Sequence, residues 1–227
     1  MNIVFDIETI PTQEPRVKDL IANGITPPAA LKKAESIAEW HANQKQTAID
    51  EAIAKTSFDG AYGQICCIGW AIDDNDVMHV VGDEKTGIEI FFSDVASCIR
   101  KDMLGGGSIS EKPVFIGHNL AAFDFRFLFQ RAVIHGIKPP ACIPFNAKAW
   151  DAQIFDTMTY FAGFGNRISL DKLAKALGLS GKGEFTGADV WPLYQAGKIA
   201  EIAEYCCDDV RLTREVYKRL TFQKNES

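Results

Sequence analysis

Short apolar segments that are typical of strands alternate along this chain with longer segments of helical pattern. The expected strands are residues 2–8, 64–72, 77–81 and 114–116, and the expected helices are residues 87–103, 123–134 and most of 168–220. The acidic turn 73–76 joins two of the strands as a hairpin, which gives antiparallel pairing. Later strands are separated by helices, which gives parallel pairing. We therefore expect an α/β fold with a mixed central β-sheet flanked by α-helices.

Residues 12–62 differ in composition from the rest of the chain. They are rich in Ala, Lys, Glu and Gln, and 29–56 has helical composition between Pro27-Pro28 and Asp59-Gly60. Such breakers are expected at the ends of a helical segment. The pattern predicts a helical insertion after the first strand. A chain of 227 residues is long enough for a substantial core, so we expect one domain over 1–227 that contains this insertion.

The composition argues against several classes of protein. Hydrophobic residues make up 47% and charged residues 24%, which is typical of a globular chain. No apolar run approaches the roughly 20 residues of a membrane helix, and the N-terminus lacks a signal-peptide pattern. The adjacent cysteines Cys66-Cys67 and Cys206-Cys207 are badly placed to bridge each other, and no pair has C-x-x-C zinc spacing. We expect a cytoplasmic protein with no membrane association and reduced, mostly buried thiols.

Two acids stand where the first expected strand ends. The sequence there is Phe5-Asp6-Ile7-Glu8-Thr9. Positions two apart on a strand face the same side, so Asp6 and Glu8 present their carboxylates together. Clustered oxygen donors of this kind suit Mg²⁺ or Mn²⁺. Taken alone, the pair also fits a strand that ends in solvated acids.

A second acid follows the expected strand 114–116. The sequence Gly-His-Asn-Leu-Ala-Ala-Phe-Asp over 117–124 places Asp124 in the first turn of a helix. An acid there also complements the helix dipole without any catalytic role. We interpret His118 as a hydrogen-bonded structural residue rather than a metal ligand.

The third motif lies in a helical segment near the end of the chain. Its sequence is Tyr205-Cys206-Cys207-Asp208-Asp209. Tyr205 and Asp209 are four residues apart and share one helix face. Asp208 is rotated by about 100° and is expected at the surface.

In this order and spacing, the three motifs resemble those of the DEDD superfamily of 3′→5′ exonucleases. The Tyr-x-x-x-Asp motif matches the tyrosine (DEDDy) subtype, because the histidine subtype has His-x-x-x-x-Asp. Asp156-Thr157 and the segments 169–174 and 177–179 are similar to the family as well. The pattern most resembles stand-alone relatives of the exonuclease domain of B-family DNA polymerases. The resemblance covers 1–10 and about 64–220 and leaves the insertion unexplained.

The resemblance implies a ribonuclease H-like fold and hydrolysis assisted by two divalent metal ions, Mg²⁺ or Mn²⁺. By analogy, Asp6 bridges both ions. Glu8 and Asp209 bind the ion that activates water, and Asp124 binds the other ion, partly through water. Tyr205 orients the attacking water, and its reference pKa of about 10 argues against a role as a strong base at neutral pH. The implied activity removes nucleoside 5′-monophosphates from the 3′ end of single-stranded DNA.

The resemblance also implies substrate contacts. The backbone of Thr9 would hold the terminal 3′-hydroxyl, and Ile10 would pack on the last base. Asn119 and Phe123 would contact sugar or base, since aromatic rings stack on single-stranded bases. Lys182 would meet a phosphate. A core position for Phe123 and a solvated loop position for Lys182 are the alternatives.

The net charge of −6 argues against a protein that coats duplex DNA with a broad basic surface. It is compatible with local capture of one strand end, so we expect a single-stranded nucleic acid as partner, with DNA favoured over RNA. Three alternatives stay open. The first is an exoribonuclease of the same superfamily, which would differ in its tolerance of the 2′-hydroxyl. The others are a non-catalytic nucleic-acid-binding module and a proofreading subunit of a replication or repair complex.

Overall fold

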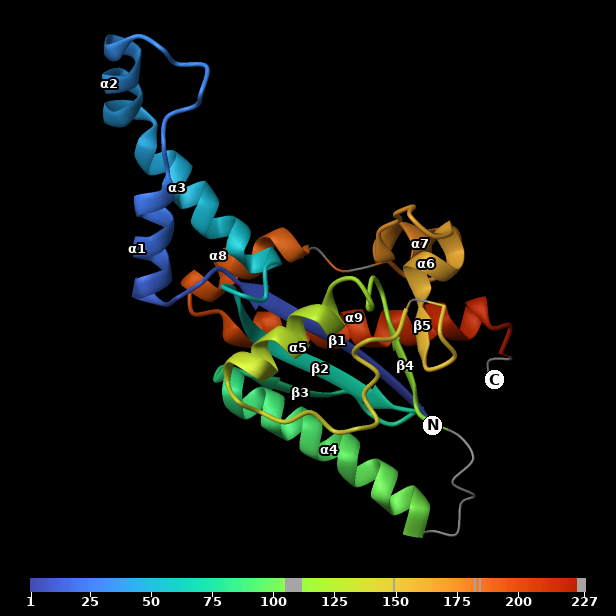
Figure 1. Ribbon diagram of the computed structural model, residues 1–227. Helices are drawn as coiled ribbons and strands as arrows, with labels where there is room; N and C mark the ends of the chain where they lie inside the picture. Colours follow the sequence, from blue (N-terminus) through green and yellow to red (C-terminus); the bar gives the residue numbers. More distant parts are fainter. Residues whose placement is uncertain (105–111, 149, 182, 184, 224–227) are drawn as a thin grey trace.

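A five-stranded mixed sheet lies at the centre of the computed structural model, which describes residues 1–104, 112–148, 150–181, 183 and 185–223 (Figure 1). Its strands are β1 (Asn2–Ile10), β2 (Gln64–Ile72), β3 (Met78–Val81), β4 (Val114–Gly117) and β5 (Ile154–Asp156), in the order β3-β2-β1-β4-β5. The strands β1, β2 and β3 pair antiparallel, whereas β4 is parallel to both β1 and β5. The predicted mixed sheet is therefore confirmed, and β1 is its central strand.

Helices cover both faces of this sheet (Figure 1). The helices that follow the insertion are α4 (Glu84–Leu104), α5 (Asp124–Ile134), α6 (Thr157–Ala162), α7 (Leu170–Ala176), α8 (Val190–Gln195) and α9 (Ile199–Leu220), with the short 3-10 helix η2 at Gly187–Asp189. The predicted helices are present, although α4 begins three residues before the expected Gly87. The sequence Gly105-Gly106-Gly107-Ser108 predicts a loop after α4, and this segment lies outside the described residues. No helix among the described residues combines the length and the apolar character needed to cross a bilayer.

Alternate side chains of β1 enter different cores. Ile3, Phe5 and Ile7 belong to the larger hydrophobic cluster, which residues of α4 and α5 complete. Val4 packs instead with Val210 of α9. Because successive strand residues point to opposite faces, the even-numbered residues of β1 face α9.

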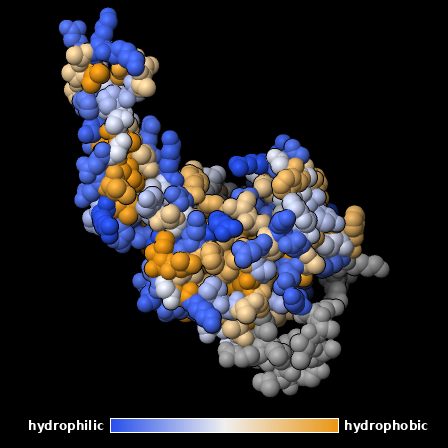
Figure 2. Space-filling view, in the orientation of Figure 1, coloured by the Kyte–Doolittle hydropathy of each residue, from blue (hydrophilic) through white to orange (hydrophobic). Residues whose placement is uncertain are grey.

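The insertion between β1 and β2 forms a helical arm. It contains α1 (Pro15–Gly24), α2 (Ala34–Asn43), α3 (Lys45–Ala54) and the 3-10 helix η1 (Lys55–Phe58). Figure 1 shows the arm projecting from the body and returning along α3, and Figure 2 shows hydrophilic and hydrophobic residues interspersed on its visible face. The helical insertion is confirmed, but α1 begins well before the expected helical stretch at residue 29. Pro15 at its first turn replaces an N–H that has no partner inside the helix.

Hydrogen bonds hold the base of the arm closed. The backbone N–H of Thr12 donates to the Thr56 hydroxyl at 2.8 Å, and the Thr9 hydroxyl donates to the Ser57 carbonyl at 2.7 Å. The two ends of the insertion are thereby fixed beside the end of β1.

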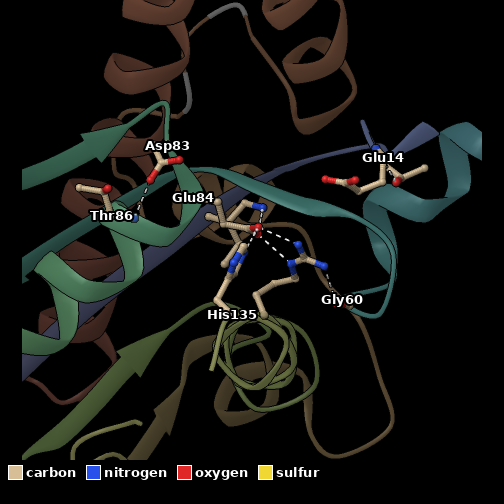
Figure 3. A network of polar contacts seen from close by, with 9 residues as sticks. Glu14, Gly60, Asp83, Glu84, Thr86 and His135 are labelled. Carbon is tan, nitrogen blue, oxygen red and sulfur yellow. Dashed lines mark hydrogen bonds and ion pairs between the residues drawn. The ribbon is translucent and has the colours of Figure 1, made fainter. Parts of the chain in front are cut away.

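A buried ion-pair network joins the arm's end to the body (Figure 3). Glu84, at the start of α4, accepts hydrogen bonds from Arg131 at 2.7 and 2.9 Å and from the Ile65 backbone at 2.7 Å. His135 Nε2 lies 2.6 Å from the same carboxylate, and Arg131 also donates to the Gly60 carbonyl at 3.5 Å. The side chains of Arg131 and Glu84 are 6% and 8% exposed, so water cannot replace a lost partner.

Arg131→Met is expected to lower the free energy of unfolding by about 3–5 kcal/mol, because it leaves the buried Glu84 carboxylate without its main partner. Adding Glu84→Gln should restore part of this loss, since the double variant removes the unpaired charge. Urea denaturation measures both. Lys175→Met is the control, because it breaks an exposed pair with Asp171 and should cost under about 1 kcal/mol. Equal stability of the single and double variants would contradict this account.

Candidate active site

Asp6 and Glu8 lie on the face of β1 that is turned toward α9. Asp6 is partly exposed and Glu8 is 7% exposed. The pairing of β1 with β2 shifts register between Glu8 and Thr9, and such an irregularity re-aims the side chains next to it. The two carboxylates therefore lie side by side on one face of β1, just before the register shift, as the sequence predicted.

Asp124 is the first residue of α5 and is 3% exposed. One of its carboxylate oxygens accepts a hydrogen bond from the Ile7 backbone at 3.3 Å. The pairing of β4 with β1 covers Asn2–Val4, so Ile7 lies beyond it. Asp124 thus takes the hydrogen bond of a β1 residue that β4 no longer pairs with. That residue, Ile7, lies between Asp6 and Glu8 in the sequence, so the three acids are close to one another.

Tyr205 and Asp209 lie one turn apart on α9 and are 7% and 4% exposed. Burial raises the pKa of Tyr205 far above its usual value, and the nearby charges of Asp209, Glu8 and Asp6 and a hydrogen bond with Asp209 add to this effect. Burial also raises the pKa of Asp124 to about 8, with contributions from the charges of Asp156 and Asp209. The structure therefore gathers all five predicted catalytic residues into one cluster.

The neighbouring Asp208 is exposed and forms an ion pair with Arg211 at 2.6 Å. It faces solvent rather than the cluster, as expected from its rotation around the helix.

Cys206 is a further member of the cluster, and the sequence analysis missed it. One ligand atom each of Asp6, Glu8 and Cys206 lie within 4.8 Å of one another, and the thiol is 3.9 Å from an Asp6 carboxylate oxygen. Gly69 of β2 makes room for this sulfur, because a Cβ there would meet it at 2.9 Å. A hydrogen bond with Cys67 and burial raise the pKa of the Cys206 thiol well above its usual value, so it keeps its proton beside the carboxylates.

Asp156 is a buried acid with a structural role that the sequence analysis did not assign. Its carboxylate caps α6 by accepting from Met158 and Thr159 at 3.1 Å each. It also accepts from the backbone of Asn119 at 3.2 Å and of Ala121 at 3.4 Å. The Asp-Thr pair at the end of a strand was the available signal, since Asp is a favoured N-cap residue. Asp156 holds the loop between β4 and α5 against the start of α6.

His118 fixes the same loop from its other side. Its Nε2 donates to the Ile168 carbonyl at 2.8 Å, and its Nδ1 lies 2.9 Å from the Thr157 hydroxyl. Both ring nitrogens therefore have partners in the protein, which agrees with the structural role predicted for His118.

A cavity of about 450 Å³ opens beside the carboxylates. It is lined by Asp6, His118, Asn119, Met158, Arg167, Ile168, Ser169, Leu170 and Asp209. Its wall thus combines two of the clustered acids with the loops that His118 and Asp156 hold. Ligand pockets in proteins are typically about 300–1,000 Å³, so this cavity is large enough for a ligand next to the acids.

The predicted substrate residues lie in different surroundings. Asn119 lines the cavity and has a left-handed backbone with φ of 65°. Phe123 is partly buried and packs on Phe127, with ring centroids 5.7 Å apart. Ile10 is 2% exposed within the core cluster that includes Cys66 and Val190. In this conformation its side chain is therefore not accessible to a nucleobase.

Of the two other residues predicted to contact substrate, the structure describes only Thr9. Thr9 is partly exposed at the end of β1 and donates its hydroxyl to Ser57. A contact of its backbone with substrate stays a prediction. Lys182 lies outside the described residues.

The donor set of the cluster suits divalent cations. Asp6, Glu8, Asp124 and Asp209 offer carboxylate oxygens from β1, α5 and α9, and hard ions such as Mg²⁺ and Mn²⁺ prefer such ligands. Burial and mutual repulsion both disfavour the charged carboxylates, as the pKa of Asp124 shows. Bound cations would offset both effects, so the residues fit such ions.

The chain belongs to a family described as predicted 3′→5′ exonucleases related to the exonuclease domain of PolB, whose model matches residues 97–226. The matched residues include Asp124, Tyr205 and Asp209 and end well after the third motif. No curated protein matches the chain in a sequence search.

Among solved structures, the fold is similar to the family B DNA polymerase from the hyperthermophilic archaeon Pyrobaculum calidifontis. The TM-score is 0.59 at 16% identity, and the match covers 97% of this chain and 24% of the polymerase. The chain thus spans about a quarter of the length of that polymerase. The Saccharomyces cerevisiae Pan2 pseudoubiquitin hydrolase–RNA exonuclease module also matches, with a TM-score of 0.43, 13% identity and coverage of 99% and 29%, which is too distant to support an argument. The sheet order and the likeness to the polymerase establish the ribonuclease H-like fold that the motifs predicted.

Without metal, the protein is expected to lose stability as the pH rises from about 4 to about 8. The pKa of Asp124 moves from 3.8 to about 8 on folding, so in this window the folded state holds a proton that the unfolded chain has released. The stabilisation is complete below the lower pKa and is lost as the pH rises through the upper one. Thermal melts in EDTA across this range measure the effect.

Asp124→Asn is the control for this experiment, because it keeps the shape of the side chain and cannot ionise. Its melting temperature should fall less steeply over the same range. Parallel curves for the two proteins would show that Asp124 does not carry the dependence.

Proposed function

We propose that residues 1–227 form one exonuclease domain that hydrolyses phosphodiester bonds at the 3′ end of single-stranded DNA and releases nucleoside 5′-monophosphates. The observation that carries the proposal is the cluster of four carboxylates and one tyrosine, gathered from three separate segments beside an open cavity. Membership of a family of predicted 3′→5′ exonucleases supports both the reaction and its direction.

The four carboxylates of Asp6, Glu8, Asp124 and Asp209 would hold two divalent cations, Mg²⁺ or Mn²⁺. When bound, these ions lower the pKa of coordinated water and neutralise the charge of the phosphate and the leaving oxygen. The carboxylates are held by the sheet and by two helices, so they are positioned before substrate arrives. Such preorganisation is what a site needs to stabilise charge that develops in the transition state.

Tyr205 would orient the attacking water. Its raised pKa means that the phenol keeps its proton, so it acts as a hydrogen-bond donor and not as a base. It lies beside Asp209, and its hydroxyl is therefore close to the carboxylates that surround the reacting phosphate. Another group has to accept the proton of the attacking water. By analogy with the family, the carboxylate of Glu8 is the candidate for this role.

Single-stranded ends suit the site better than duplex ends. Bases at a duplex end have to unpair before they enter a cavity, which costs free energy. With a net charge of −6, the protein also lacks the broad electrostatic attraction to phosphates that tight duplex binding requires. A 5′-labelled strand should therefore give a ladder of shortened products with Mg²⁺ or Mn²⁺ and none in EDTA.

The same assay with DNA and RNA oligonucleotides determines the preferred sugar. We expect DNA to be degraded faster, and the reverse order would reassign the protein as an exoribonuclease. A labelled mononucleotide as the first product would indicate 5′→3′ polarity and contradict the proposal.

Alanine at Asp6, Glu8, Asp124 or Asp209 is expected to abolish most activity while the protein stays folded. Because the four residues would bind metal as a unit, double variants should be little worse than single ones. Rates on labelled single strands, together with thermal melts, test this. Asp208→Ala is the matched control, since that acid is exposed on the same helix. A nearly wild-type rate in any of the four variants would remove that residue from the site.

Tyr205→Phe should lower kcat by about 10²-fold or more, the usual size of a positioning or proton-transfer contribution. KM should change little, because the hydroxyl would act on the attacking water rather than on bound DNA. Tyr217→Phe is the control, because it removes a hydroxyl about three turns further along α9, where the ring packs on Phe155. Full activity in Tyr205→Phe, with at most about 1 kcal/mol of lost stability, would show that the tyrosine only packs.

A further inference from the structure

A second cavity of about 480 Å³ adjoins the one beside the carboxylates. Asn119, Met158 and Arg167 line both cavities, so a ligand that fills the first can extend into the second. The remaining wall of the second cavity comes from the loop between β4 and α5, the loop before β5, the junction of β5 and α6, and the segment after α6.

Two exposed aromatic side chains line the second cavity. Trp150 is 61% exposed and Phe164 is 76% exposed. Their ring centroids are 5.2 Å apart with an interplanar angle of 75°. An edge-to-face pair of this kind leaves ring faces open, and open ring faces are the surfaces on which unpaired bases stack.

Cationic side chains flank the aromatic pair. The Nζ of Lys148 lies 5.5 Å from the centre of the Trp150 ring. Arg167 is exposed and lies in the wall shared by the two cavities. Two exposed cations beside two aromatic rings match a single strand, which presents phosphates and bases in alternation.

The acids near this cavity already have backbone partners. Asp156 lines it, but its carboxylate accepts from the backbone of the loop and of α6 as described above. Asp151 accepts from the Lys148 backbone at 2.8 Å and so shapes the loop that carries Trp150. Asp156 is therefore part of the cavity wall and Asp151 supports the loop beside it, and the exposed cations remain on the surface of the cavity.

The position of the second cavity in the sheet indicates which part of the strand it would receive. β1, β4 and β5 are parallel and adjacent, so their carboxyl ends share one edge. Open α/β sheets bind ligands along this edge. Thr9, the expected site of the terminal 3′-hydroxyl, follows the acids on β1, whereas the second cavity lies at the ends of β4 and β5. A strand with its 3′ end on β1 would therefore run toward β5 in its 5′ direction.

We propose that the cavity lined by Trp150 and Phe164 binds a nucleobase of the substrate strand on the 5′ side of the hydrolysed bond, by stacking without sequence preference. Lys148 and Arg167 contact the phosphates next to this base. The assignment of the 5′ side rests on the proposed function, whereas the binding of a single strand at this cavity does not. The contact strengthens binding of longer strands and leaves the chemical step unchanged.

The test measures binding of a labelled single-stranded DNA oligonucleotide to the full chain in EDTA, where no hydrolysis interferes. Trp150→Ala and Phe164→Ala should each weaken the dissociation constant by about 10-fold, the usual effect of one lost base–aromatic stack. Trp150→Phe should recover much of the affinity, because it restores a ring. Phe222→Ala is the matched control, since that ring is 92% exposed and lines neither cavity.

Hydrolysis with added metal gives a second readout. For long strands the two alanine variants should raise KM with kcat unchanged, because the contact acts on binding and not on the chemical step. Unchanged affinity in both alanine variants would overturn the proposal while leaving the exonuclease intact. If the alanine variants bind more weakly than the wild type but the wild type cuts no strand, the binding site would be supported and the proposed reaction overturned. Failure of the wild-type chain to bind any single strand in EDTA would overturn the binding site, and hydrolysis with added metal would judge the proposed reaction separately.

Discussion

Four carboxylates packed against the central strand are the constraint on which this structure depends. Ionised acids are costly to bury, and each raises the cost of ionising the next. The opposite face of β1 offsets this cost, because Phe5 lies within 5.3–6.4 Å of the rings of Phe91, Phe125 and Phe115. One strand thus carries an aromatic core contact on one face and two acids of the cluster on the other. Separating them this way keeps the acids from weakening the core.

Outside the cluster, the protein stabilises two buried acids by different means. Glu84 has a paired guanidinium and a histidine, and Asp156 has backbone N–H groups from a helix and a loop. In the cluster around Asp6, burial and neighbouring carboxylates raise the pKa of Tyr205 and Asp124, and backbone hydrogen bonds offset only part of the effect at Asp124. Glu84 and Asp156 thus have positive groups or several N–H donors as neighbours, whereas the acids of the cluster have other carboxylates as neighbours. The cluster is arranged differently, in the way expected of a site completed by cations.

Hydrogen bonds fix the loop that lies beside the cluster. His118 and Asp156 bind the loop between β4 and α5 from its two sides, and the same loop carries Asn119 in a left-handed conformation. That conformation is uncommon outside glycine, although Asn tolerates it better than most residues. The arm is fixed at the opposite end of the site by Thr12 and Thr56. Elements that carry none of the clustered acids therefore determine the shape of the cavity beside them.

The sequence by itself determined the strand and helix pattern, the insertion and the five residues of the cluster, because these depend on short periodicities and local spacing. Tyr205 and Asp209 share a helix face wherever that helix lies, and Asp6 and Glu8 share a strand face. Helix α1 was missed, since its short pattern begins at a proline, Pro15, and ends shortly before the proline pair Pro27-Pro28. The burial of Ile10 was also missed, because strand alternation alone does not show which face another element covers.

Only the tertiary structure decided which residues from distant segments meet. Cys206 enters the cluster because β2 has a glycine at position 69, which lets α9 approach closely. Asp156 reaches the loop before α5 because β5 lies beside β4. Trp150 and Phe164 form one aromatic surface because the loop before β5 and the segment after α6 converge beside Asn119. Local sequence patterns contain no information about such contacts, because they arise from the packing of the whole sheet and its helices.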